Sequence, residues 1–453
     1  MTTDSSPTTA PDARRSRRRE QRGWYFYDWA NSAFSTTVLT VFLGPYLTNV
    51  AKAASAAGDP VTLLGVIPVT AESYFPYLVS VSVVLQILLM PIVGAMADIV
   101  RSKRLVMAVA AYTGAFAVMG MFFLQGTNYQ LGGLLFVIAN VAFGCAVVVN
   151  NSFLPDIASP DERDRVSSWG WAMGYVGGCL LLIVNLVLYL GHASFGVEEG
   201  MAVRISLASA GLWWAVFTII PLMRLKDRAP RAAQRGSALT GGFRQLGHTL
   251  RELPRYPQAF MFLLAFFFFN DGIQTVIGLS ATYASQELKL DTTTIITAVL
   301  VVQVVGIIGA LLLGRLARTL GAKRVVLASL VLWVLVLVAA YLLPASKATL
   351  FLVLAALIGF VLGGSQALSR SLFSQLIPRD REAEYFSLYA VSDGASSILG
   401  PLVFGLSLQF LGSYRIAILA LVVFFIVGGI LLTRVNVRRG IAEVGNVAPT
   451  SLA

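Results

Sequence analysis

Long apolar segments alternate with short polar ones along most of the chain. An α-helix needs about 20 residues to cross the hydrocarbon core of a bilayer, and twelve apolar segments meet that length. They lie at residues 24–50, 73–97, 105–125, 130–154, 167–190, 203–223, 258–282, 293–316, 323–343, 349–375, 386–410 and 414–433. The pattern therefore predicts an all-α membrane protein with twelve transmembrane helices, six on each side of a polar stretch at residues 224–257.

A repeated stretch indicates that the two groups of six helices are related. Its first copy is Gly94–Arg104 and its second is Gly314–Arg324, each between the second and third span of its group. The two copies share residues without a gap at Gly94/Gly314, Ala97/Ala317, Lys103/Lys323 and Arg104/Arg324. Such a repeat is typical of transporters built from two parallel halves.

The polar segments predict the domain organisation. We expect a disordered basic tail at 1–22, a six-helix half at 23–223, a cytoplasmic connector at 224–257, a second half at 258–433 and a cytoplasmic tail at 434–453, with disorder from residue 440 onward. In the connector, Phe243, Leu246, Leu250 and Leu253 have helical spacing. This stripe predicts either a helix on the membrane surface or a simple tether.

Composition and charge agree with the membrane assignment. Hydrophobic residues make up 57% of the 453 residues and charged residues only 13%, which excludes an ordinary soluble protein. The net charge of +11 does not indicate nucleic acid, because the basic residues lie between apolar spans. In the predicted topology, 28 of the 34 Lys and Arg residues lie on the side of both termini. The positive-inside rule therefore predicts that both termini are cytoplasmic.

The sequence lacks the residue patterns of an enzyme or a metal protein. Cys145 and Cys179 lie inside apolar spans, so we expect buried free thiols, and His192 and His248 lie in different loops. No nucleophile–base cluster, metal-ligand cluster or phosphate-binding loop is present in the sequence. We therefore expect no enzymatic activity, no cofactor, no metal and no ATP drive within this chain.

Charged residues inside the spans are the candidates for function, because a charge in hydrocarbon is costly. They are Asp28, Asp271, Arg370 and Asp393. The third, sixth, ninth and twelfth spans have no such residue away from their ends, which fits a polar cavity lined by the other spans. We predict a substrate or proton site made of Asp28, Asn31, Asn150, Asn151, Asn270, Asp271, Gln274, Gln366, Arg370 and Asp393.

Each of these residues has a structural alternative. Asp271 follows four phenylalanines and is our candidate for a proton carrier or a contact to a substrate amine. It could equally form a permanent ion pair with Arg370 or a hydrogen bond between helices. Arg370 could bind a substrate carboxylate in a two-pronged hydrogen bond, or it could be held by Asp393. For Asn150 and Asn151, helix packing is the alternative to lining a cavity.

The repeat resembles the signature that the major facilitator superfamily carries between its second and third helices. The resemblance implies the major facilitator fold and a conformational latch between the halves. The latch residues are Gly94, Asp98, Arg101, Lys103 and Arg104 in the first copy, and Gly314, Arg318, Lys323 and Arg324 in the second. Because Arg318 replaces the acidic residue, we expect a weaker latch, or none, in the second copy. The alternative is that these basic residues only set the topology.

A narrower resemblance is to the vacuole-effluxer branch of that superfamily, which comprises fungal autophagy-related amino-acid effluxers and bacterial relatives. It rests on Tyr27–Phe34 (Tyr-Asp-Trp-Ala-Asn-Ser-Ala-Phe), Asn151–Asp156, Asn270–Gly272 and Ser369–Ser371. The resemblance implies a permease, with amino acids as one candidate substrate class. The Arg-rich tail and the lack of an organellar signal are typical of a bacterial plasma-membrane protein.

Together these observations predict a secondary active transporter that moves a small polar solute by alternating access, coupled to protons. We expect a monomer whose partners are the solute, protons and membrane lipid, with no nucleic acid. Two alternatives remain open. One is a transporter-like receptor or scaffold that no longer transports, and the other is a lipid exporter.

Overall fold

The computed structural model describes residues 10–228 and 251–449, apart from residues 59, 64, 101, 253–254, 380, 396–398 and 412. The N-terminal half contains α1 (Ala10–Ala33), the π-helix η1 (Phe34–Phe42), α2 (Leu43–Ala56), β1 (Thr62–Leu63), β2 (Ile67–Pro68), α3 (Ala71–Ile99), α4 (Lys103–Gly120), the 3₁₀-helix η2 (Met121–Phe123), α5 (Tyr129–Ser152), α6 (Leu154–Ile157), α7 (Arg163–Leu190) and α8 (Glu199–Arg224). The C-terminal half contains α10 (Pro257–Gln286), α11 (Thr292–Leu320), α12 (Ala322–Leu342), α13 (Ala348–Gln375), α14 (Glu382–Ala395), α15 (Leu399–Leu411), α16 (Tyr414–Ala420), α17 (Val422–Arg434) and α18 (Val437–Glu443).

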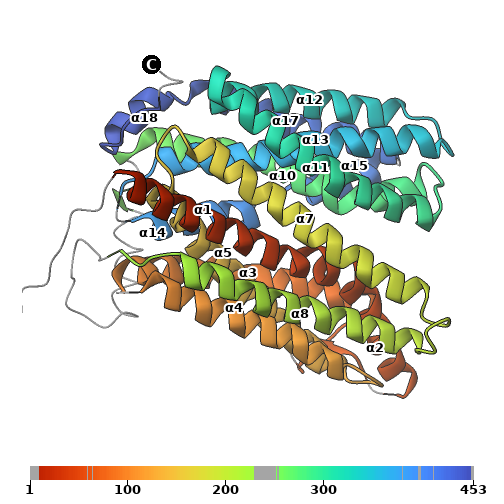
Figure 1. The fold of residues 1–453 in the computed structure, drawn as a ribbon. Coiled ribbons are helices and arrows are strands. Elements are labelled where there is room, and N and C mark those ends of the chain that lie inside the picture. The colour runs from red at the N-terminus through yellow and green to blue at the C-terminus, as the bar shows by residue number, and fades with distance from the viewer. Residues whose placement is uncertain are drawn as a thin grey trace, which may run out of the picture.

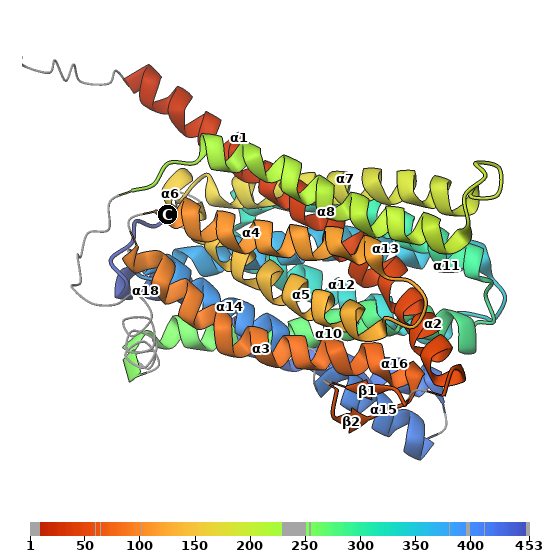
Figure 2. The same cartoon turned by 90° about the horizontal axis from the view of Figure 1, so that it is seen from below.

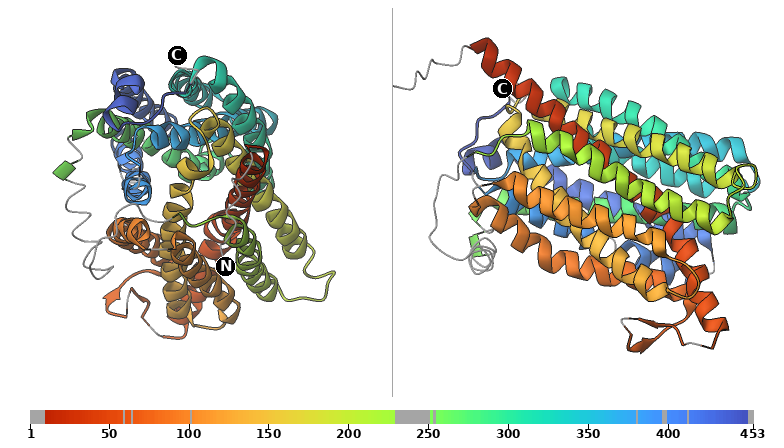
Figure 3. Two further views of the ribbon diagram at one scale, coloured as in Figure 1. Left: turned by 60° about the vertical axis from the view of Figure 1, so that its left-hand side comes forward. Right: turned by 60° about the horizontal axis from the view of Figure 1, so that its bottom comes forward.

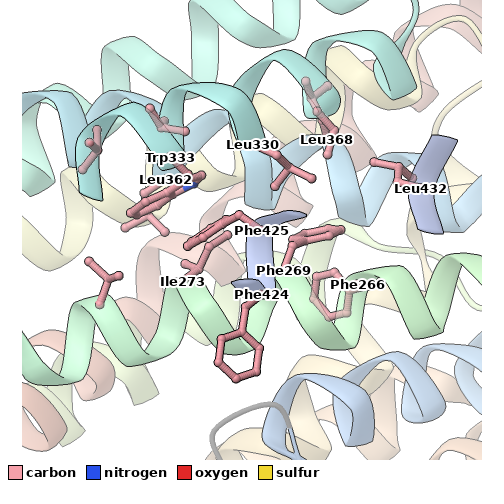
Figure 4. Close-up of a cluster of buried hydrophobic side chains, with 14 of the residues drawn as sticks. Phe266, Phe269, Ile273, Leu330, Trp333, Leu362, Leu368, Phe424, Phe425 and Leu432 are labelled. Atoms are coloured by element: carbon pink, nitrogen blue, oxygen red, sulfur yellow. The ribbon is translucent and has the colours of Figure 1, made fainter. Parts of the chain in front are cut away.

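The long helices run side by side and form two groups that correspond to the two predicted halves (Figure 1). The left view of Figure 3 looks roughly along the helices and shows the two groups one above the other. Each half has an apolar core of its own. In the C-terminal core, the rings of Trp333 on α12 and Phe425 on α17 stack at 5.4 Å, and Phe269 of α10 belongs to the same cluster (Figure 4).

Ten helical segments of the described chain are long and apolar enough to cross a membrane. Each of the other two predicted spans is covered by more than one helix, and residues 396–398 of the second lie outside the described residues. Span 24–50 consists of α1, η1 and α2, and the π-helical register of η1 occupies its middle. Span 386–410 consists of α14 and α15. The structure therefore confirms the all-helical membrane fold, while the count of twelve spans stays a prediction.

The chain is more ordered near its ends than the sequence predicts. Helix α1 begins at Ala10 and includes residues 10–22, which we expected to be disordered. Its polar residues make contacts: Gln21 Nε2 donates to Ile157 O at 2.9 Å, and Glu20 accepts from Arg228 at 3.2 Å. After α18, Asn446 Nδ2 donates to the carbonyl oxygens of Gln375 and Ile377.

The apolar stripe of the connector, Phe243, Leu246, Leu250 and Leu253, lies outside the described residues.

Both copies of the repeat lie at one end of the bundle, which we call the basic end. It is the end that also carries the start of α1 and α18, at the left of Figure 1, and the β1–β2 hairpin lies at the opposite end (Figure 2). At the basic end the halves meet along two seams. In one, α3 and α5 pack against α14, and in the other, α7 packs against α11 and α13.

The glycine that begins each copy of the repeat lies in one of these seams. A Cβ atom added to Gly94 of α3 would lie 2.5 Å from Ala383 O and 2.9 Å from Ser387 Cβ, both on α14. A Cβ atom added to Gly314 of α11 would lie 2.6 Å from Ser168 Cβ on α7. Only a residue without a side chain allows such close approach of two helices.

We predict that Gly94→Ala destabilises the protein by about 1–3 kcal/mol, the usual cost of overpacking, because the backbone of α14 would have to move. Thermal unfolding in detergent measures this as a lower melting temperature. Gly278→Ala on α10 is the matched control, because a Cβ there meets no atom within 4 Å. Equal melting temperatures for the two variants would contradict the close packing at Gly94.

Candidate functional site

The first copy of the repeat joins the two halves by charge and hydrogen bonds. The carboxylate of Asp98 accepts from the backbone N–H groups of Ala383 (3.2 Å) and Glu384 (2.9 Å), and so caps the first turn of α14. Lys103 Nζ lies 2.9 Å from Asp98 and 3.7 Å from Glu382. Lys103 therefore lies between carboxylates from both halves, while Arg101 lies outside the described residues.

Arg104 has a different partner. Asp227, just after α8, accepts from Ser102 Oγ at 2.6 Å and from the N–H and Nε groups of Arg104 at 3.0 and 2.9 Å. Partial burial raises the pKa of Asp227, but these hydrogen bonds outweigh burial and lower that pKa below its ordinary value. This cluster holds the start of α4 against the end of α8, within one half.

The second copy of the repeat makes contacts mainly within its own half. Lys323 Nζ donates to the carbonyl oxygens of Thr433 (2.8 Å) and Val435 (2.7 Å) at the end of α17. Arg318, which replaces the acidic residue, is exposed, and so is Arg324. Gly314 packs against Ser168 of the other half. The weaker latch that we expect from Arg318 stays a prediction.

The second seam is held by polar groups of α7 and α13. Arg163 donates to Ser374 O at 2.6 Å, Ser371 Oγ donates to Asp164 at 2.6 Å, and Ser167 Oγ donates to Ala367 O at 2.7 Å. All of these residues are buried. These residues are not among the site residues that the sequence predicts. The one available signal was the charged stretch at residues 160–165, which introduces the fifth predicted span.

Deeper in the bundle, Arg370 of α13 forms an ion pair across the halves with Asp28 of α1, at 3.1 Å. The two side chains are only 6% and 13% exposed. Arg370 also donates to Ser167 Oγ and Ser167 O, each at 2.9 Å, and to Asn151 Oδ1 at 3.3 Å. The partner of Arg370 is thus Asp28, and neither Asp271 nor Asp393 takes that place.

Aromatic rings and a glycine complete the environment of Arg370. Its guanidinium carbon lies 4.6 Å from the ring centre of Trp24 and 5.6 Å from that of Trp171. Arginine stacks well on aromatic faces because its planar charge is weakly hydrated. A Cβ added to Gly170 would lie 2.5 Å from Asp28 Oδ2. Gly170 therefore leaves the space in which the ion pair forms.

Asp271 of α10 contacts the start of α15, in the eleventh predicted span. Its Oδ1 atom accepts from Gly400 N at 2.9 Å, in the first turn of α15. The residue is fully buried, and its Oδ2 atom has no hydrogen-bond partner among the described residues. A carboxylate at a helix N-terminus is stabilised by the unpaired N–H groups and the helix dipole. Asp271 thus supports α15 and does not face Arg370.

Asp393 of α14 belongs to a chain of amides. It accepts from Asn270 Nδ2 at 2.6 Å and from Gln274 Nε2 at 3.3 Å, and Gln366 Nε2 donates to Asn270 Oδ1 at 2.7 Å. Asp393 and Gln274 are partly exposed. Since Gln366 lies one helical turn from Arg370, the two polar groups adjoin, with the Asp393 group farther from the basic end.

The remaining predicted residues lie around this centre. Asn151 contacts Arg370 directly. Asn31 is buried to 7% exposure on α1, one turn beyond Asp28. Asn150 is fully buried: its backbone oxygen accepts from Trp24 Nε1 at 2.8 Å, while its amide atoms have no partner among the described residues. The structure thus brings together most of the predicted site, and it separates Asp271 from it.

Comparison with solved structures defines the class of protein. A mutant of the proton:xylose symporter XylE of the major facilitator superfamily covers 94% of this chain with a TM-score of 0.69 at 13% identity, and 98% of the symporter is matched. FucP, a major facilitator transporter solved in the outward conformation, covers 92% of this chain and is matched over 98% of its own length, with a TM-score of 0.63 at 14% identity. The fold is therefore that of the major facilitator superfamily.

Sequence comparison gives the family. Residues 16–445 match the family described as vacuole effluxer Atg22 like, and the chain belongs to that family. An uncharacterized MFS-type transporter, YxiO of Bacillus subtilis (strain 168), is 29% identical over 91% of this chain and 94% of its own. Autophagy-related protein 22-1 of Penicillium rubens is 27% identical over 95% of this chain and 92% of its own. The chain is thus a multi-pass membrane transporter of this family.

We predict that Asp28→Asn lowers the free energy of unfolding by about 3–5 kcal/mol, because it leaves the buried charge of Arg370 without its counter-charge. Arg370→Gln should have a similar effect, and the double variant should cost clearly less than the sum of the two. Unfolding in detergent by heat or denaturant measures all three variants.

The control is the ion pair of Arg415 with Glu287, whose side chains are 29% and 25% exposed. Glu287→Gln should cost only about 0–1 kcal/mol, since an accessible pair contributes little. Strict additivity of Asp28→Asn and Arg370→Gln would show that the two residues do not stabilise each other.

Proposed function

We propose that this transporter moves a small zwitterionic solute, with amino acids as the leading class, by alternating access coupled to protons. The observation that carries the proposal is the buried ion pair of Asp28 with Arg370, which connects the halves at the depth where the polar groups gather. A buried charge pair between moving parts separates at low cost only if other charges replace the partners.

A zwitterion offers both replacements. Its carboxylate can take the place of Asp28 on the planar donor face of Arg370, in a two-pronged hydrogen bond. Its amine can then pair with the released Asp28 or with Asp393, which lies next in the polar chain through Gln366 and Asn270. A solute with only one charge would leave one of the buried groups without a partner. This is the physical basis for expecting selectivity for zwitterions.

We assign the proton to Asp393. Two neutral amides, of Asn270 and Gln274, donate to its carboxylate, and Asp393 is partly exposed, so a proton can reach it. Asp271, which the sequence favoured for this role, has one oxygen occupied by the N–H of Gly400. Protonation of Asp393 would remove a negative charge from the solute site and so weaken the binding of an amine.

We place the basic end on the cytoplasmic side of a bacterial plasma membrane. The support is the asymmetry of charge, because 28 of the 34 Lys and Arg residues belong to the segments on that side of the predicted topology. With the contacts of Asp98, Lys103, Arg163 and Asp164 in place, this end is closed. In this orientation the described state is closed on the cytoplasmic side.

We predict that purified protein in liposomes exchanges labelled zwitterionic amino acids and that an imposed pH gradient accelerates their net flux. Asp393→Asn should retain exchange but lose the response to the gradient, because an amide cannot carry the proton. Asp271→Asn is the matched control: it makes the same change in the adjacent span and should keep the response.

Three results would contradict parts of this proposal. Loss of the gradient response in Asp271→Asn but not in Asp393→Asn would identify Asp271 as the proton carrier. Equal transport of analogues that lack the amine would remove the zwitterion argument. An absence of flux for every amino acid, from folded protein, would favour another solute class, a lipid, or a scaffold without transport.

A further inference from the structure

A basic cavity of about 660 Å³ lies at the basic end of the C-terminal half, away from the proposed solute site. The turn between α11 and α12 forms one wall, and the segment from the end of α17 into α18 forms another. These elements lie close together at the upper left of Figure 1. The basic side chains in the lining are Lys323, Arg324, Arg434 and Arg438.

The cavity has an excess of positive charge. Arg324 and Arg434 are exposed, and neither has a carboxylate partner among the described residues. Lys323 is bound to the carbonyl oxygens of Thr433 and Val435, which do not cancel its charge. Asp164 is the one acidic residue in the described lining, and it is buried and accepts from Ser371. The mouth of the cavity therefore attracts an anion.

Comparison of the two copies of the repeat shows that the first half has a carboxylate at the position where the anion would bind in the second half. Arg324 corresponds to Arg104, and Arg104 holds Asp227 by its backbone N–H and its Nε group. Asp227 follows the last residue of α8, Arg224, by three positions. The residue three positions after Arg434, where α17 ends, is Val437, which cannot supply a charge. The first half thus provides a carboxylate from its own chain, and the second half does not.

We propose that this cavity binds the phosphate group of an anionic phospholipid. Two or more guanidinium groups that converge on one cavity suit a phosphate, which accepts several charge-assisted hydrogen bonds at once. The position favours a lipid over a soluble phosphate. Leu320 lines the cavity, and Leu316 and Leu320 are 42% and 46% exposed on the outer face of α11. Basic pockets between helices at the membrane surface are typical headgroup sites, with the acyl chains along such apolar faces.

The test measures retention of phosphatidylglycerol by the full-length protein in detergent, by native mass spectrometry and by the shift in melting temperature on adding the lipid. We expect specific retention and stabilisation by phosphatidylglycerol and little effect of phosphatidylcholine. Arg324→Gln and Arg434→Gln should each weaken retention about tenfold, the effect of losing one charge-assisted hydrogen bond. Arg439→Gln is the matched control, because Arg439 is exposed on α18, outside the lining, and pairs with Glu443.

The outcomes separate the sources of the anion. Glycerol 1-phosphate or inorganic phosphate that stabilises the protein as strongly as the lipid would overturn the lipid assignment in favour of a soluble phosphate. An equal loss in Arg439→Gln would show a general attraction of charge and overturn the cavity. Unchanged retention in Arg324→Gln and Arg434→Gln, with their melting temperatures in the absence of lipid equal to that of the wild type, would do the same. Transport is not measured in this test, so its result is independent of the proposed solute.

Discussion

The ion pair of Arg370 with Asp28 is the constraint around which the rest of the bundle is arranged. A charged side chain inside a membrane span is costly if nothing compensates it, and Arg370 lies inside α13, near its end at Gln375. Arg370 is compensated entirely by the other half: Asp28 neutralises it, Ser167 and Asn151 accept its hydrogen bonds, and Trp24 and Trp171 cover its faces. The charge of Arg370 is therefore compensated only while the N-terminal half lies against the C-terminal half.

Because Arg370 depends on the other half, the seams that hold the two halves together at the basic end also stabilise the ion pair. They hold the halves at the distance at which Arg370 can reach Asp28. The seam at α3 and α14 uses charges, with Lys103 between Asp98 and Glu382. The seam at α7 and α13 uses buried hydrogen bonds, such as that of Arg163 to Ser374. The two glycines of the repeat set the spacing of both seams, because each lies where a side chain would force the helices apart.

The sequence predicts the fold better than it predicts the site, for physical reasons. Spans follow from hydropathy and the halves from the repeat, and both are local properties of the chain. The partner of Arg370 is not local, because Asp28 lies 342 residues away, and only packing decides which of the three carboxylates inside the spans it meets. The seam residues Asp164 and Ser167 were missed for the same reason. Polar residues such as these are common at the start of a helix, and only the packing of α13 against them distinguishes them.

Asp271 illustrates how one signal in the sequence is compatible with both a functional and a structural role. A lone carboxylate among phenylalanines suggests a titrating group, because its charged form is costly there. In the structure Asp271 Oδ1 accepts from the backbone N–H of Gly400, in the first turn of α15. A buried carboxylate and a buried N–H group near a helix start thus satisfy each other. Asp393 of α14 differs from Asp271 in that it is partly exposed and accepts from two side-chain amides, those of Asn270 at 2.6 Å and Gln274 at 3.3 Å.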